Sequence, residues 1–98
     1  MKTDRRRHAQ LLRALAHPTR LEILARLAEG PSCVGAIRDL LEVSQPNLSQ
    51  HLSVLRKEGL VDFEEKGKQR CYCLTRPALV RDLLGFISGA RLRKEGAP

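Results

Sequence analysis

The chain has 98 residues, which is the size of one small domain and excludes two independent hydrophobic cores. Its 18 Lys and Arg residues outnumber its 11 Asp and Glu residues, which gives a net charge of +7. Most of the basic residues are Arg, which matches phosphate groups and guanine edges well, so an anionic partner is favoured. The aromatic content of 3% argues against stacking on single-stranded nucleic acid and against sugar binding.

The apolar spacing predicts four helices in the first part of the chain, at about residues 4–15, 18–29, 33–41 and 45–58. Pro18 suits the first turn of the second helix, and Gly30 suits the position after its end. Ser44 is a good N-cap for the fourth helix. In the third helix the positions predicted to face inward are Val34, Ile37, Leu40 and Leu41.

A change of period after Gly59 predicts a short β-hairpin. The period becomes two: Val61, Phe63 and Glu65 alternate with Asp62 and Glu64, and Arg70, Tyr72 and Leu74 alternate with Cys71 and Cys73. Gly67 between the two segments permits the positive φ of a tight turn. From Pro77 onward the helical period returns. The predicted fold is therefore mainly α with a short β-hairpin, in the order four helices, hairpin and fifth helix.

The third and fourth helices are separated by about three residues, which predicts a helix-turn-helix. Amide and hydroxyl side chains fill the exposed positions of the fourth helix, where they can bond base edges and phosphates. The basic hairpin tip at 66–70 resembles a wing that lies over a DNA backbone. The alternative interpretation of these polar residues is a solvated helix face.

Three stretches resemble the ArsR/SmtB family of winged-helix repressors: Ala14–Leu24 (ALAHPTRLEIL), Ser44–Arg56 (SQPNLSQHLSVLR) and Gly59–Val61 (GLV). Gly67 and the segment Tyr72–Leu74 resemble the wing of that family, so the match covers roughly residues 11–75. The resemblance implies a homodimeric winged helix-turn-helix repressor that leaves its operator when an inducer binds.

The residues predicted to contact double-stranded DNA, partly by that analogy, are Ser44, Gln45, Asn47, Ser49, Gln50, His51, Lys68 and Arg70. For His51, a phosphate contact and a capping role within the core are both open. Glu42 departs from the family, whose turn commonly has Gly here. If this site is left-handed, Glu42 costs about 1 kcal/mol.

The first and fifth helices carry apolar stripes that one small core cannot cover. Two-fold pairing buries such stripes and also matches two DNA half-sites. We therefore predict a single domain over 1–98, with the helix-turn-helix at 33–58, the wing at 60–75 and dimerisation helices at 4–15 and 77–93. No membrane span or signal peptide is predicted, so a cytoplasmic protein with no membrane partner is expected.

The three cysteines, Cys33, Cys71 and Cys73, are expected to be reduced, since an odd number fits poorly with a disulfide framework. Cys33 begins a helix, whose N-terminus favours the thiolate. Cys71 and Cys73 lie on one face of a strand and are predicted to be the firmer unit for a soft ion. No cofactor is certain, but arsenite or another soft metal ion bound by thiolates is a candidate inducer. The alternative is that these are ordinary strand residues.

The expected last helix has no His and only Asp82 well placed, which disfavours zinc or cobalt as the inducer. No spacing typical of a catalytic site occurs, so the chain is predicted not to be an enzyme. Two other function classes remain open. One is a winged-helix module that binds protein or RNA without an operator, and the other is a thiol-based metal carrier or redox protein.

Overall fold

The computed structural model describes residues 4–90 and contains five helices and three strands. In chain order they are α1 (Arg5–Leu15), α2 (Pro18–Leu27), β1 (Ser32–Cys33), α3 (Val34–Leu41), α4 (Gln45–Lys57), β2 (Val61–Lys66), β3 (Gln69–Leu74) and α5 (Pro77–Ala90). The predicted order of four helices, a hairpin and a fifth helix is confirmed. Residues 91–93 of the predicted last helix lie outside the described residues.

Local capping explains where α2 and α4 begin. The Nδ1 atom of His17 accepts a hydrogen bond from the backbone N–H of Thr19 at 3.0 Å, and the Oγ atom of Ser44 accepts one from Asn47 at 3.3 Å. Both helices have Pro in their first turn, where a missing N–H costs nothing. The cap at His17 thus fixes the start of α2, and the cap at Ser44 fixes the start of α4.

The strand β1 was not predicted from the sequence. It pairs antiparallel with β3, so the sheet has three strands in the order β1-β3-β2. Two residues are too few to show an alternating pattern, and only the tertiary contact with β3 reveals the strand. The hairpin itself is as predicted, since the register pairs Lys66 with Gln69 and Gly67 has a φ of 62°.

One apolar core holds these elements together. Its buried members are Leu15, Ile23, Leu24, Leu27, Ile37, Leu48, Leu52, Leu55, Leu60, Val61, Tyr72 and Val80. The prediction that Leu40 faces inward is wrong, because its side chain is 59% exposed. On α3 the fully buried position is Ile37, and Val34 and Leu41 are packed against the core.

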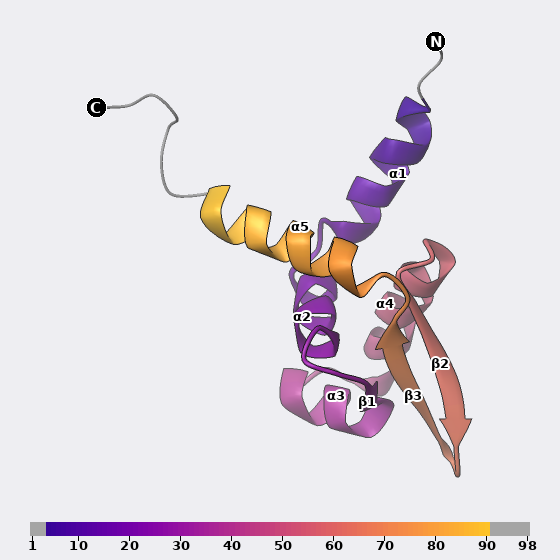
Figure 1. Cartoon of the computed structure of the whole chain (residues 1–98). Coiled ribbons are helices and arrows are strands. Elements are labelled where there is room, and N and C mark those ends of the chain that lie inside the picture. Colours follow the sequence, from indigo (N-terminus) through magenta and orange to yellow (C-terminus); the bar gives the residue numbers. More distant parts are fainter. Residues whose placement is uncertain (1–3, 91–98) are drawn as a thin grey trace.

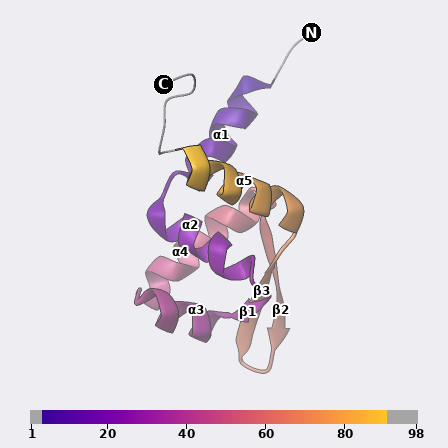
Figure 2. The ribbon, with the colours of Figure 1, turned by 60° about the vertical axis from the view of Figure 1, so that its left-hand side comes forward.

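The molecule has two distinct ends. The first and last helices, α1 and α5, lie at one end, and the hairpin tip and α3 lie at the other (Figure 1). Figure 2 shows the same separation after a turn of 60°. Within residues 4–90, no helix has both the length and the apolar character needed to cross a membrane.

Candidate nucleic-acid interface

A groove of about 290 Å³ runs between α4 and the hairpin. It is lined by Val34, Gln45, Ser49, Ser53, Arg56, Phe63, Lys68, Arg70 and Tyr72. Four of the eight residues predicted to contact DNA, Gln45, Ser49, Lys68 and Arg70, are therefore brought together. They come from α4 and from the hairpin that follows it in the chain, and they combine hydrogen-bonding groups on a helix with cations on a wing.

The other predicted residues lie outside this groove. Asn47 and Gln50 are exposed on α4, and Ser44 is exposed at its N-cap. The helix presents these polar groups to solvent because Leu48, Leu52 and Leu55 anchor its opposite face in the core. All three exposed residues sit at the N-terminal half of α4, which is the part of a recognition helix that meets base edges.

Arg38 of α3 orients the side chain of Gln45. Its Nη1 atom donates a hydrogen bond to Oε1 of Gln45 at 2.9 Å. Arg38 also lies 3.4 Å from the carboxylate of Asp39. Sequence reasoning did not single out Arg38. The signal that could have indicated this contact is a basic residue in the preceding helix, seven positions before Gln45.

Two arginines pack over the ring of Phe63 at the groove. The guanidinium carbons of Arg70 and Arg56 lie 4.3 and 4.6 Å from the centre of its ring. Arg70 also approaches Glu65 to 3.9 Å, and Arg56 approaches Asp62 to 3.1 Å. Cation–π contact and exposed ion pairs are each weak, but together they restrict the positions of two cations beside α4.

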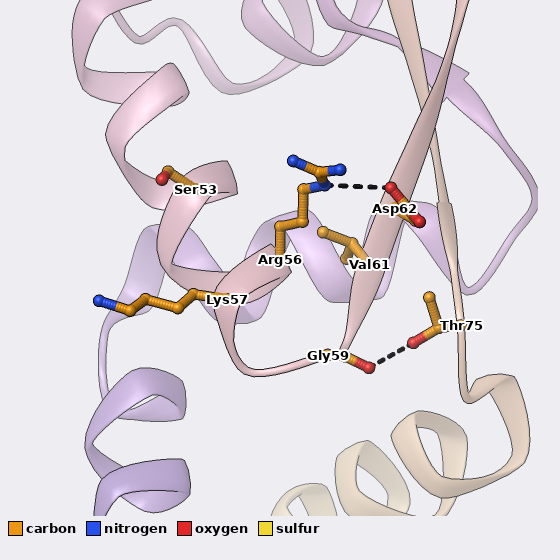
Figure 3. A pocket seen from close by; sticks show the side chains of 7 residues that line it. All are labelled: Ser53, Arg56, Lys57, Gly59, Val61, Asp62 and Thr75. Carbon is orange, nitrogen blue, oxygen red and sulfur yellow. Dashed lines mark hydrogen bonds and ion pairs between the residues drawn. The ribbon is translucent and has the colours of Figure 1, made fainter.

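A second hollow, of about 490 Å³, lies at the start of β2 (Figure 3). Ser53 and Arg56 line both this hollow and the groove. There the hydroxyl of Thr75 donates a hydrogen bond to the carbonyl of Gly59, which ties the end of β3 to the end of α4. The pKa of the Asp62 carboxyl lies below its usual range, because the N–H of Phe63 and the side chain of Arg56 both donate to it. The exposed surface of α4 is thus continuous from one hollow to the other.

His51 faces α2 and the α1–α2 junction. Its Nδ1 atom accepts a hydrogen bond from Nε of Arg20 at 3.2 Å, and its ring centre lies 4.4 Å from that of His17. Burial, followed by the charges of His17 and Arg20, lowers the pKa of His51 below 6.5. Of the two roles left open for His51, these contacts with Arg20 and His17 favour the one within the protein over the phosphate contact.

The cysteines are arranged differently from the prediction. Cys33 and Cys71 lie directly opposite each other in β1 and β3 and are joined by a disulfide, so two of the three thiols are not free. Cys73, which was expected to form a unit with Cys71, is a free, half-buried thiol that stands opposite Asp62. Within residues 4–90 no three Cys, His, Asp or Glu side chains lie close enough to hold a metal ion.

Apolar side chains are exposed at the end formed by α1 and α5. Leu12, Leu79 and Ile87 are exposed, and Phe86 is 73% exposed. Beside them lies a small apolar hollow of about 100 Å³, lined by Leu11, Leu12, Leu15, Leu60, Leu79, Val80 and Leu83. This surface lies away from the groove and has no charged lining residue.

Comparison with known proteins identifies relatives of the chain. Residues 17–62 match the family described as "Bacterial regulatory protein, arsR family". The biofilm growth-associated repressor of Agrobacterium fabrum is 44% identical over 73 residues, which are 74% of this chain and 62% of that protein. The chain therefore spans less than two thirds of the length of this curated relative.

Solved structures share the fold. NolR from Sinorhizobium fredii has a TM-score of 0.81 at 34% identity, covering 90% of this chain and 87% of that one. The homodimeric winged helix-turn-helix DNA-binding domain of Mb0332 from Mycobacterium bovis, a possible ArsR-family regulator, has a TM-score of 0.78 at 26% identity, covering 100% and 97%. The relatives are named as regulators, which confirms the prediction that the chain is not an enzyme. With the winged helix-turn-helix architecture and these matches, the chain belongs to the arsR family of bacterial regulatory proteins.

Proposed function

We propose that this protein is a homodimeric, sequence-specific DNA-binding repressor of transcription. The observation that carries the proposal is the groove in which Gln45 and Ser49 of α4 face Lys68 and Arg70 of the hairpin. A recognition helix needs hydrogen-bonding groups near base edges, and a wing needs cations near phosphates. The groove brings both together, on a chain whose net charge is +7.

In this function the N-terminal half of α4 enters the major groove of the operator. The amide of Gln45 reads a base, with Arg38 holding its orientation until the DNA replaces that contact. Ser44, Asn47, Ser49 and Gln50 bond base edges or phosphates nearby. Lys68 and Arg70 bind the backbone beside the major groove and position the protein without reading sequence.

The dimer forms through the apolar surface of α1 and α5. Exposed Leu12, Leu79 and Phe86 are buried when two copies pair about a two-fold axis. Because these helices lie at the end opposite the hairpin tip, pairing leaves both grooves open to DNA (Figure 1). The two grooves of the dimer then bind two half-sites of an operator in the cytoplasm.

Release from the operator by a thiophilic metalloid such as arsenite, or by a thiol-reactive signal, is the regulation we propose. The support is the presence of three cysteines on β1 and the wing strand β3, of which Cys33 and Cys71 become free thiols only when their disulfide is reduced. A ligand on these sulfurs changes the wing on which Lys68 and Arg70 are carried. The affinity for DNA falls as a result.

The test compares Gln45→Ala with Arg70→Ala on two DNAs, the chain's own upstream DNA and a random duplex. Gln45→Ala should weaken the specific site by about 1–3 kcal/mol and relax its base preference. Arg70→Ala should weaken both DNAs alike. Equal losses on both DNAs for both variants would show that α4 is not the recognition helix.

Salt provides the control for the mode of binding. A dimer with about 6–10 phosphate contacts loses roughly 10³–10⁵ in affinity between 50 and 200 mM salt. Affinity that does not change with salt, or binding to RNA in place of duplex DNA, would contradict the proposed function. Metal transfer without any DNA affinity would favour the thiol-based carrier.

A further inference from the structure

The Cys33–Cys71 disulfide joins two parts of the molecule that face the candidate interface. Cys33 is the N-cap residue of α3, the first helix of the helix-turn-helix, and Cys71 lies in the middle of the wing strand β3. The two residues are separated by 38 positions, so the closed loop contains α3, α4 and β2. A single bond therefore ties the reading helix pair to the wing.

We propose that Cys33 and Cys71 form a reversible redox site whose disulfide holds the wing in its DNA-binding position. The inference rests on the proposed function, and it assigns release from DNA to reduction of this one pair of sulfurs, in place of attack by a thiol-reactive agent. It differs from the expected Cys71–Cys73 unit, since Cys71 is bonded across the sheet to Cys33. Disulfides in the cytoplasm, where we propose that the protein works, are typically transient and often sense redox state.

The co-reactants are a small-molecule disulfide as the oxidant and a dithiol as the reductant. Cys33, which is less buried than Cys71, attacks the small-molecule disulfide as a thiolate. A mixed disulfide forms and one small thiol leaves. The Cys71 thiolate then attacks the Cys33 sulfur, the protein disulfide closes, and a second small thiol leaves. The protein loses two protons and two electrons, which the two small thiols carry away.

Few other contacts hold β1 to the wing, so the covalent bond has a large effect on their relative position. The ladder between β1 and β3 has two residue pairs, Ser32 with Tyr72 and Cys33 with Cys71. The side chain of Cys33 makes no capping hydrogen bond to α3. The side chain of Gln69 provides a further link, since it accepts a hydrogen bond from Gly35 at 3.2 Å.

The direction of regulation follows from the position of the groove. With the disulfide closed, Gln45 and Ser49 face Lys68 and Arg70 across one groove, so both parts of the interface are in place before DNA arrives. Preorganisation of this kind increases affinity because less freedom is lost on binding. Reduction removes the tie, the wing moves more independently of α4, and affinity falls.

The experiment uses the full chain in two states, oxidised with oxidised glutathione and reduced with dithiothreitol. Intact mass after alkylation should show one labelled thiol in the oxidised protein, Cys73, and three in the reduced protein. Amide hydrogen exchange across β2, β3 and the start of α3 should be slower in the oxidised state. Affinity for the upstream DNA should be on the order of tenfold higher in the oxidised state.

Three variants complete the design. Cys73→Ser is the matched control, because it removes a thiol from the same strand and keeps the pair, so its redox response should equal that of the parent. Cys33→Ser and Cys71→Val each remove the pair, and the latter keeps an apolar, strand-forming side chain at the buried position. Both should have the same DNA affinity with either reagent.

Three results would each overturn the inference. They are labelling of all three thiols after treatment with the oxidant, equal amide exchange in the two states, and DNA binding of equal affinity in the two states. If neither state binds DNA, the proposed function is contradicted instead. The labelling and exchange measurements then still test whether Cys33 and Cys71 form a redox site.

Discussion

The Oε1 atom of Gln69, at the start of the wing strand β3, accepts a hydrogen bond from the backbone N–H of Gly35 in α3 at 3.2 Å. The N-cap residue of α3, Cys33, provides no side-chain cap, so an amide from the hairpin takes over that role. A Cβ atom on residue 35 would stand 3.0 Å from Oε1 of Gln69. The absence of a side chain at Gly35 thus lets the wing approach the helix-turn-helix.

A double-mutant cycle between Gln69 and Gly35 tests this cap. Gln69→Ala should lower the free energy of unfolding by about 1 kcal/mol, because an orphan N–H of α3 loses its partner. Gly35→Ala should stabilise the Gln69→Ala protein by up to about 1 kcal/mol through helix propensity, and the parent protein by less. Urea unfolding at matched protein concentration measures both values. Gln50→Ala, on the exposed face of α4, is the control, and additive effects in the cycle would argue against the contact.

Glu42 ends α3 in the left-handed conformation, with φ 53° and ψ 43°. A cost for Glu42 was expected if this site is left-handed, and the site is left-handed. Glu42→Gly should raise the free energy of unfolding by about 1 kcal/mol, because Gly adopts this conformation without a steric cost. For a domain of this size the melting temperature should rise by about 4–8 °C. Glu42→Ala keeps the Cβ atom and should give no such gain; an equal rise in that variant would point to charge as the cause.

Phe86 of α5 is the sharpest probe of the dimer. Its side chain is 73% exposed, whereas Leu83 packs partly against the core of its own chain. Phe86→Asp should therefore weaken association without unfolding the chain. Burial of one such side chain contributes about 1.5–3 kcal/mol, and two copies are lost by symmetry, so the dissociation constant should rise by more than about 100-fold.

Sedimentation or sizing over a concentration series measures this change. Ser88→Asp is the matched control, because residue 88 lies about 200° around the helix from residue 86 and should leave the dimer intact. Circular dichroism confirms that both variants are folded. An undisturbed dimer of Phe86→Asp would place the interface elsewhere.

His51 predicts a pH dependence of stability. Burial first, and then the charges of His17 and Arg20, lower the pKa of His51 in the folded protein below 6.5. The unfolded chain therefore binds the proton more readily than the folded one. The stabilisation from neutral His51 is complete above about pH 6.5 and is lost as the pH falls toward and through the lower folded pKa.

Unfolding measured between about pH 7.5 and 5.5 should show this decrease in the parent protein. In His51→Gln the same decrease should be smaller, because the titrating group has gone. The control is His8→Gln, which removes a histidine from the exposed surface of α1 and should keep the profile of the parent. A profile that is the same in His51→Gln as in the parent would show that His51 is not the group that causes the decrease.

The sequence alone determined the order of the five helices and the hairpin, and the residues at which α2 and α4 begin. Helix starts at Pro18 and after Ser44 depend on residues within one turn of each other, so they can be read without knowledge of the fold. The hairpin was equally local, because Gly67 sits between two alternating segments. The face of α4 that bears Gln45 and Ser49 followed from the spacing of its buried leucines.

Contacts between segments distant in the chain were decided by the tertiary structure. The strand β1, the Cys33–Cys71 bond and the Arg20–His51 hydrogen bond join residues 31 or more positions apart. No local pattern specifies such a meeting, since it depends on how helices pack around a shared core. Strand alternation placed Cys71 and Cys73 on one face of β3, but the neighbour of Cys71 across the sheet is Cys33 of β1, a strand that the sequence did not predict. The partner of a side chain in a sheet is set by the register between strands, and that register exists only once the chain is folded.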